Sequence, residues 1–184
     1  MLAAALPLAS GCTDKPRPNL DQIRAGWKSP DTRGLNLPAY DPDVLAVCDP
    51  PIGWKPDPLK VGPNHTHQVW LSPTGDTAYG VIHFTMPLPV GLKLALSGFM
   101  NEMKSTEGEA TLLGNQDDPK LPGIRFVAEG GLYRIHANLI VTGWEGWTVY
   151  AGSFRAKPVA VDEFDAAVRA RENTHVGQPE NPKP

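Results

Sequence analysis

The segment 132–141 constrains the fold more than any other part of this chain, because one face of the strand it predicts is apolar without interruption. Its apolar positions fall at every second residue, namely Tyr133, Ile135, Ala137, Leu139 and Val141. The positions between them include Arg134, His136 and Asn138. Since successive side chains of a β-strand point to opposite faces, this pattern predicts a strand with one face packed on a core.

Further strands are predicted on each side of this segment, at 66–72, 77–86, 110–114, 124–128 and 147–155. Residues 115–123 are expected to form a loop, and 43–48 a short apolar helix or strand. Glycine-containing turns at 73–76, 130–131 and 143–146 separate neighbouring strands, which favours antiparallel pairing. In 77–86 we expect Ala78, Ile82, Phe84 and Met86 to face the core, and Tyr79, Val81, His83 and Thr85 to lie on the opposite face.

Two helices are predicted. Residues 89–104 carry an apolar stripe formed by Leu92, Leu96, Phe99 and Met103, with Gly108 placed to end the helix. Residues 161–171 are expected to turn Val161, Phe164 and Val168 inward. Two strands, a helix, three or four strands and a final helix indicate an α+β fold, with an antiparallel sheet layered with two main helices.

Composition limits the classes of function. The net charge is −3 and the basic residues are dispersed, so no nucleic-acid partner is expected. Cys48 lies in an apolar run and is expected to be a buried thiol rather than a reactive one. Residues 43–173 have the size of a single globular domain, and the polar, proline-containing segment 174–184 is expected to be a disordered tail.

The first dozen residues follow a different pattern. An apolar run leads into Leu8-Ala-Ser-Gly-Cys12, which resembles a bacterial lipobox. This resemblance implies a lipoprotein signal over 1–12, acylation of Cys12, and a protein held by its lipid on the periplasmic side of the cell envelope. The proline-rich segment 13–42 then reads as a disordered tether.

The globular part resembles the PsbP-like family, which includes an extrinsic photosystem protein and many bacterial lipoproteins. The resemblance rests on an early turn, Pro51-Ile-Gly-Trp54-Lys, on the hairpin 72–76 before the helix at 91–104, and on the meander and final helix across 123–171. It implies an α/β/α sandwich with a binding or assembly role, and it carries over no catalytic residues.

Polar side chains on two predicted strands form the first candidate site. Tyr79 and His83 lie on the non-core face of one strand, and Arg134, His136 and Asn138 on the non-core face of another. If the two strands lie near each other, these five side chains converge and could hold a small anion or a carboxylate. The alternative is an ordinary solvated sheet face.

The hairpin turn at 143–147 supplies the second candidate. Trp144 and Trp147 flank it, and an exposed aromatic side chain at such a tip commonly anchors a partner protein. The alternative is that one tryptophan folds back to cap the core. Histidines supply a third candidate, a small-ligand or metal site involving His65, His67, His83 or His136, although no full set of ligands is visible and no metal or cofactor is expected.

No catalytic motif accompanies these features. The chain lacks a nucleophile elbow, a phosphate-binding glycine loop, a His-Glu-x-x-His sequence and a Cys-x-x-Cys pair. The expected function is therefore a non-enzymatic binding or assembly module of the cell envelope, with another envelope protein as its partner. A small-ligand or metal-binding protein is the alternative, and an enzyme ranks third.

Overall fold

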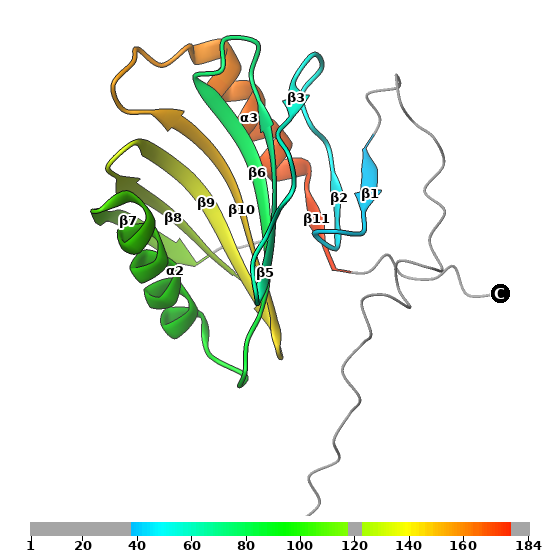
Figure 1. Ribbon diagram of the computed structural model, residues 1–184, viewed down its shortest axis with the longest axis vertical. Coiled ribbons are helices and arrows are strands. Elements are labelled where there is room, and N and C mark those ends of the chain that lie inside the picture. The colour runs from blue at the N-terminus through cyan, green and yellow to red at the C-terminus, as the bar shows by residue number, and fades with distance from the viewer. Residues whose placement is uncertain (1–37, 118–122, 178–184) are drawn as a thin grey trace, which may run out of the picture.

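The computed structural model describes residues 38–117 and 123–177 as a mixed α+β fold with antiparallel sheets (Figure 1). The large sheet has the strand order β3 (Lys55–Pro56), β5 (His65–Leu71), β6 (Thr77–Thr85), β10 (Glu145–Phe154), β9 (Tyr133–Thr142), β8 (Gly123–Gly130) and β7 (Ala110–Asp117), with β4 (Lys60–Val61) also paired to β5. A small sheet has the order β1 (Ala39–Asp41), β2 (Ala46–Cys48) and β11 (His175–Val176).

The predicted strands and hairpins are confirmed, and neighbouring strands pair antiparallel throughout. Strand boundaries shift by one to three residues, and two of these shifts have a clear cause. Strand β7 continues to Asp117, where a loop was expected, because its second half pairs with β8 beyond a bulge between Leu112 and Gly114. Strand β10 begins at Glu145 rather than at residue 147, because the turn between β9 and β10 is only two residues long.

Helix α2 (Leu92–Glu107) covers one face of the sheet. Its predicted stripe is confirmed, since Leu96 and Met103 are buried against Phe126, Ala137 and Leu139 of the sheet. The helix ends as expected at Gly108, whose φ of 80° lies in the left-handed region and whose N–H donates to the carbonyl oxygen of Lys104 over 2.9 Å.

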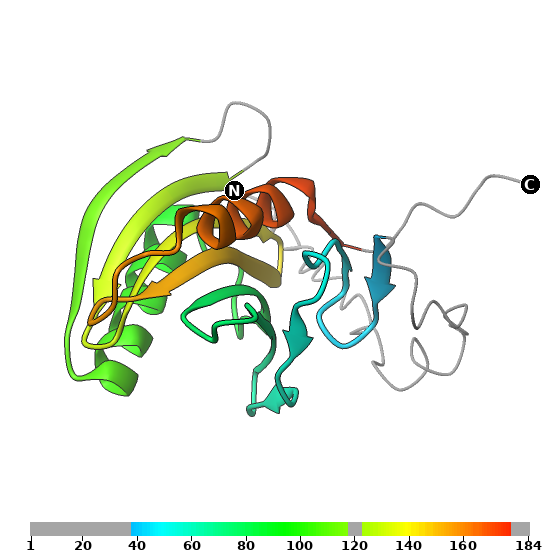
Figure 2. The same ribbon diagram turned by 90° about the horizontal axis from the view of Figure 1, so that it is seen from above.

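Helix α3 (Val161–Asn173) and the small sheet cover the opposite face, as Figure 2 shows from above. The two small side chains of Ala167 and Ala170 are buried there and allow the helix to approach the strands closely. The expected inward position of Val161 is wrong. It lies in the first turn, beyond the edge of the packed face, and is 66% exposed.

The large sheet is therefore buried on both faces near its centre. Tyr79 and Val81 were expected on a non-core face, yet both are fully buried against residues 44–48 and helix α3. Ile82 and Phe84, on the other face of the same strand, are only partly buried. The prediction of a single core face failed because the covering segment comes from a part of the chain distant in sequence.

The folded part of the chain is longer than the range 43–173 that the sequence indicated. Strand β1 lies within the expected tether, and β11 lies within the expected tail and pairs with β2. Cys12, the signal at 1–12, the remainder of the tether and residues 178–184 lie outside the described residues. Neither helix of the described ranges combines the length and the apolar character needed to traverse a membrane.

Candidate functional site

Tyr79 is part of the core between the sheet and helix α3. Its ring stacks on Trp70 with 5.0 Å between ring centroids, and its hydroxyl lies 2.6 Å from Thr174 Oγ1. Because the Thr174 hydroxyl donates to the carbonyl oxygen of Ala170, the Tyr79 hydroxyl is the donor in this pair. Burial raises the pKa of Tyr79, so it remains a neutral hydrogen-bond donor.

His83 and Asn138 are also buried. His83 is 3% exposed, its ring lies 5.2 Å from that of Trp147, and its Nε2 lies 3.8 Å from Glu145 Oε1. Burial lowers the pKa of His83 to about 4, which keeps the imidazole neutral near pH 7. Asn138 is 4% exposed, and its Oδ1 accepts no hydrogen bond from the described residues.

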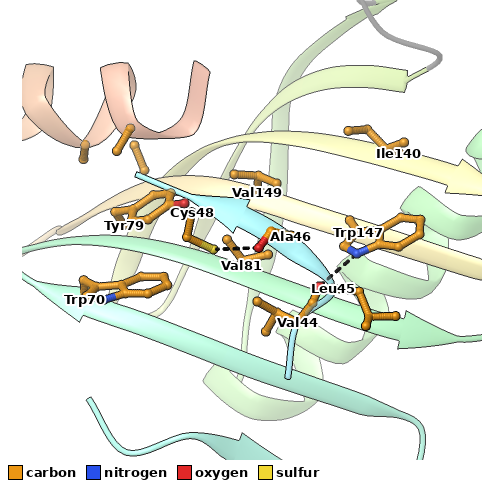
Figure 3. Close-up of a cluster of buried hydrophobic side chains, with 13 residues drawn as sticks. Val44, Leu45, Ala46, Cys48, Trp70, Tyr79, Val81, Ile140, Trp147 and Val149 are labelled. Atoms are coloured by element: carbon orange, nitrogen blue, oxygen red, sulfur yellow. Dashed lines mark hydrogen bonds between the residues drawn. The ribbon is translucent and has the colours of Figure 1, made fainter. Parts of the chain in front are cut away.

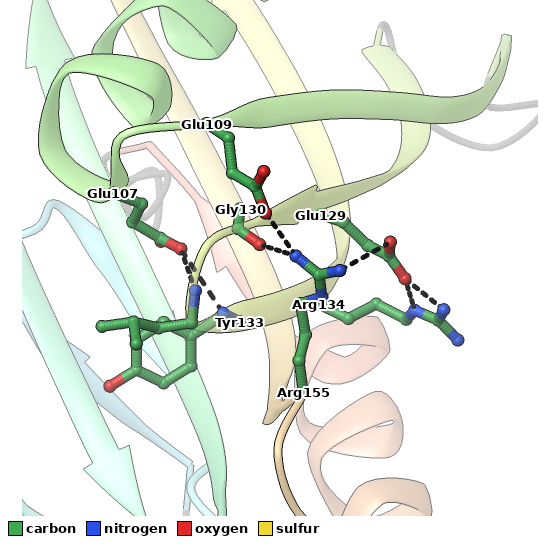
Figure 4. Close-up of polar contacts among 8 residues, drawn as sticks. Glu107, Glu109, Glu129, Gly130, Tyr133, Arg134 and Arg155 are labelled. Atoms are coloured by element: carbon green, nitrogen blue, oxygen red, sulfur yellow. Dashed lines mark hydrogen bonds and ion pairs between the residues drawn. The ribbon is translucent and has the colours of Figure 1, made fainter.

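His136 and Arg134 lie on the same face of β9 as Asn138 and closer to the start of the strand. The ring of His136 meets Phe164 of α3 edge-on with centroids 5.0 Å apart, and burial lowers its pKa, with the nearby Arg171 and Arg134 acting in the same direction. Arg134 is exposed and forms an ion pair with Glu129 of β8 (Figure 4).

These five side chains do not converge, so the expected anion site is not formed. Strand β10 lies between β6 and β9, with Ala151 in register with both Tyr79 and His136. At about 4.8 Å between adjacent strands, the backbones of Tyr79 and His136 lie about 10 Å apart. Helix α3 and residues 44–48 fill the space above this row, so the face is neither open nor solvated.

Charged side chains gather instead at the β8–β9 turn. Arg155 Nη1 donates to Glu109 Oε1 and to the carbonyl oxygen of Gly130, each over 2.6 Å, and its Nη2 lies 3.9 Å from Glu129 Oε2 (Figure 4). A pocket of about 340 Å³ adjoins this cluster, and Lys157 on its wall pairs with Asp76. The acidic partners compensate the basic groups, so the pocket has no excess positive charge with which to attract an anion.

The histidines are divided between the two faces of the sheet. His65 and His67 share one face of β5, and His67 Nε2 lies 2.7 Å from the Tyr150 hydroxyl. Burial lowers the pKa of His67 to about 4. His83 and His136 lie on the opposite face. Among the described residues, no group of three or more His, Cys, Asp or Glu side chains is arranged to hold a metal ion.

The two tryptophans of the β9–β10 hairpin have different environments. Trp147 is 2% exposed, and its indole N–H donates to the carbonyl oxygen of Val44 over 3.0 Å (Figure 3). Trp144 is 52% exposed at the turn, where Gly143 adopts a φ of 62°. The Met86 N–H donates to the Trp144 carbonyl oxygen over 2.8 Å, which brings the exposed Leu88 near the same end of the sheet. We call Trp144 and Leu88 the Trp144 tip.

An open pocket of about 500 Å³ lies between the turn at 49–54 and helix α3. The sequence did not predict this second surface feature. Trp54, in the early turn Pro51-Ile-Gly-Trp54-Lys, packs partly against the core and contributes to the pocket wall, together with the exposed Ile52. Two carboxylates on the rim are already bonded, Asp49 to Asn173 over 2.9 Å and Glu163 to Thr74 over 2.6 Å.

Comparison with known proteins adds little to this geometry. No protein-family model matches the chain, and no curated protein matches it. One solved structure, a crystal structure from Bacteroides thetaiotaomicron VPI-5482, is similar over 79% of this chain at 11% sequence identity and a TM-score of 0.38. This chain corresponds to 50% of the length of that one.

Proposed function

We propose that this protein is a lipid-anchored component of the bacterial cell envelope, whose PsbP-like domain is a non-enzymatic binding or assembly module. The acylated residue is Cys12, and the segment that follows it separates the folded domain from the membrane surface. The partner is another envelope protein, and it binds the Trp144 tip. The observation that supports this proposal is the exposure of Trp144 on a rigid hairpin.

The hairpin holds Trp144 in a fixed position. Strands β9 and β10 remain paired up to Thr142 and Glu145, so only Gly143 and Trp144 form the turn. The hydrogen bond from Met86 to the Trp144 carbonyl oxygen ties the turn to the end of β6. Binding therefore orders little additional backbone, which lowers its entropic cost.

The exposed indole is suited to an apolar pocket on the partner. Covering about 100 Å² of its apolar surface contributes about 2.5 kcal/mol at the usual value for buried area. Leu88, which is 65% exposed, adds a second apolar contact. Tryptophan is among the residues that most often carry the binding energy of an interface.

Photo-crosslinking in cells tests the proposal. A benzophenone amino acid replaces Trp144 in the full chain, and after irradiation the envelope fraction is examined for a discrete covalent adduct. The matched control places the same amino acid at Leu132, which is 58% exposed at the turn between β8 and β9, at the opposite end of β9. We expect an adduct at position 144 and none at 132. Adducts at both positions, or at neither, would contradict a specific partner at the tip.

The anchor has its own experiment. Cys12→Ser removes the sulfur that would carry the lipid, so the variant is expected to leave the membrane fraction. Mass spectrometry of the unaltered chain should then show an N-terminal acylated cysteine at position 12. An unmodified thiol at Cys12 in the native protein, or a Cys12→Ser variant that stays in the membrane fraction, would refute the anchor but not the partner at the tip.

A further inference from the structure

The two edges of the large sheet are built differently. One edge consists of β3 and β4, which are two residues each and contain Lys55, Pro56 and Lys60. Short strands, lysine and proline are the usual means of preventing a sheet edge from pairing with another chain. This edge is therefore protected.

Strand β7 forms the other edge, and it carries little of this protection. It is eight residues long, reads Ala-Thr-Leu-Leu-Gly-Asn-Gln-Asp, and contains no Lys, Arg or Pro. Seven of its eight residues are exposed, among them Leu112 and Leu113. In the described part of the chain it pairs with β8 alone, so the backbone groups of its outer edge have no strand partner there.

The bulge in β7 gives the strand a symmetric pattern. Pairing with β8 passes from Leu112 directly to Gly114, so Leu113 is the extra residue. Consequently Ala110, Leu112, Asn115 and Asp117 face the α2 side, while Thr111, Gly114 and Gln116 face the α3 side. Among the seven residues that pair with β8, this pattern of faces reads the same from either end, with Gly114 at its centre.

We propose that β7 pairs antiparallel with β7 of a second copy of this chain, about a two-fold axis at Gly114. This register places Leu112 opposite Asn115, Thr111 opposite Gln116 and Ala110 opposite Asp117, and each pair lies on one face of the joined sheet. The single charged residue of the strand, Asp117, then faces an alanine rather than its own copy, so no like charges oppose each other. An isologous contact of this kind closes on itself as a dimer.

The partner is a second copy because the strand can pair with itself in this register with matching faces and without opposing like charges. The proposal concerns a surface distinct from the Trp144 tip and does not depend on lipidation. The dimer can therefore be tested on the full chain carrying Cys12→Ser, which removes the proposed acylation site and one of the two cysteines. Cys48, the other cysteine, is buried.

A charge exchange at one opposed pair tests the register. Leu112 and Asn115 have uncharged neighbours on β8, Ala128 and Phe126, so a charge placed there responds mainly to the second copy. The variant L112K/N115K opposes two lysines at two symmetric positions and should weaken the dimer at least about tenfold. The variant L112K/N115E opposes lysine to glutamate and should restore it. Sedimentation velocity across a concentration series measures the dimer affinity of the two charge variants and of the chain without them.

A crosslink supplies a second, independent measurement. A Cβ at Gly114 would meet no atom within 4 Å, so Gly114→Cys is expected to fold normally. Opposed residues of an antiparallel pair have Cα atoms about 4.5–5.5 Å apart, which a disulfide can span, so mild oxidation should give a covalent dimer. Leu132→Cys is the exposed control outside β7 and should give no covalent dimer on oxidation.

The proposal fails if the chain is monomeric at all concentrations and Gly114→Cys does not crosslink. It also fails if both charge variants are dimers of equal affinity, because the dimer then uses another surface. Loss of the dimer in both charge variants, with thermal unfolding unchanged, would refute the register.

Discussion

The indole N–H of Trp147 donates to the carbonyl oxygen of Val44 over 3.0 Å, between two residues that are more than a hundred positions apart. This bond ties strand β10 to the turn between β1 and β2. The same turn contains Leu45, a buried residue with a φ of 49° in the left-handed region. Few non-glycine residues adopt such a conformation, and it persists because the surrounding contacts hold it.

The first prediction concerns this bond. Trp147→Phe keeps an aromatic ring but removes the donor and leaves the Val44 carbonyl oxygen buried without it. We expect a loss of about 2–3 kcal/mol in the free energy of unfolding, measured by urea denaturation. Trp144→Phe is the matched control at the exposed position and should change stability by less than about 0.5 kcal/mol. Equal effects of the two substitutions would contradict the assigned environments.

The second prediction compares two glycines. A Cβ at Gly80 would overlap the ring of Tyr150, whose hydroxyl bonds to His67. Gly80→Ala should therefore displace that ring and cost about 2 kcal/mol or more. At Gly98, in helix α2, a Cβ meets nothing within 4 Å. Gly98→Ala should stabilise the protein by about 0.5–1 kcal/mol. Thermal unfolding shifts of opposite sign would confirm the contrast, and a neutral Gly80→Ala would contradict it.

The third prediction concerns pH. Burial lowers the pKa of both His67 and His83 from 6.5 to about 4 in the folded chain, so between these values the unfolded chain binds more protons. These two histidines therefore do not reduce the free energy of unfolding above about pH 6.5. As the pH drops toward 4, each of them lowers it by up to about 3 kcal/mol. Burial raises the pKa of Asp41 and Glu145, which acts in the opposite sense.

Single substitutions separate the histidines from the carboxyl groups. His83→Gln and His67→Gln should each reduce the slope of stability against pH between 4 and 6.5 by up to one proton. Urea midpoints measured from pH 4 to 7.5 provide the slope. If both variants keep the slope of the unaltered chain, the acid sensitivity arises elsewhere.

The local elements were predictable because their causes are local. The alternation in 132–141, the stripe on 92–103 and the glycine turn at 73–76 each depend on residues within a few positions of one another. The structure contains all three predicted elements, namely strand β9, helix α2 and the hairpin between β5 and β6. The boundaries at Asp41 and His175 were missed, because each of those short strands requires β2 as a distant partner.

The candidate site was predictable only in part. Sequence reasoning offered two environments for the hairpin tryptophans, and the structure leaves Trp144 exposed while Trp147 is buried. The five polar candidates were chosen on the assumption that one face of each strand is open. That assumption failed for Tyr79, His83 and Asn138. All three are buried on the face of the sheet that residues 44–48 and helix α3 cover.

The sequence by itself determined which residues form strands and helices and that consecutive strands pair antiparallel, because propensity, alternation and turn chemistry act over short distances. Only the tertiary structure decided which faces are solvated. That outcome depends on where residues 44–48, helix α3 and strand β10 settle on the sheet, and the free energy that places them comes from burying apolar surface shared between segments far apart in the chain.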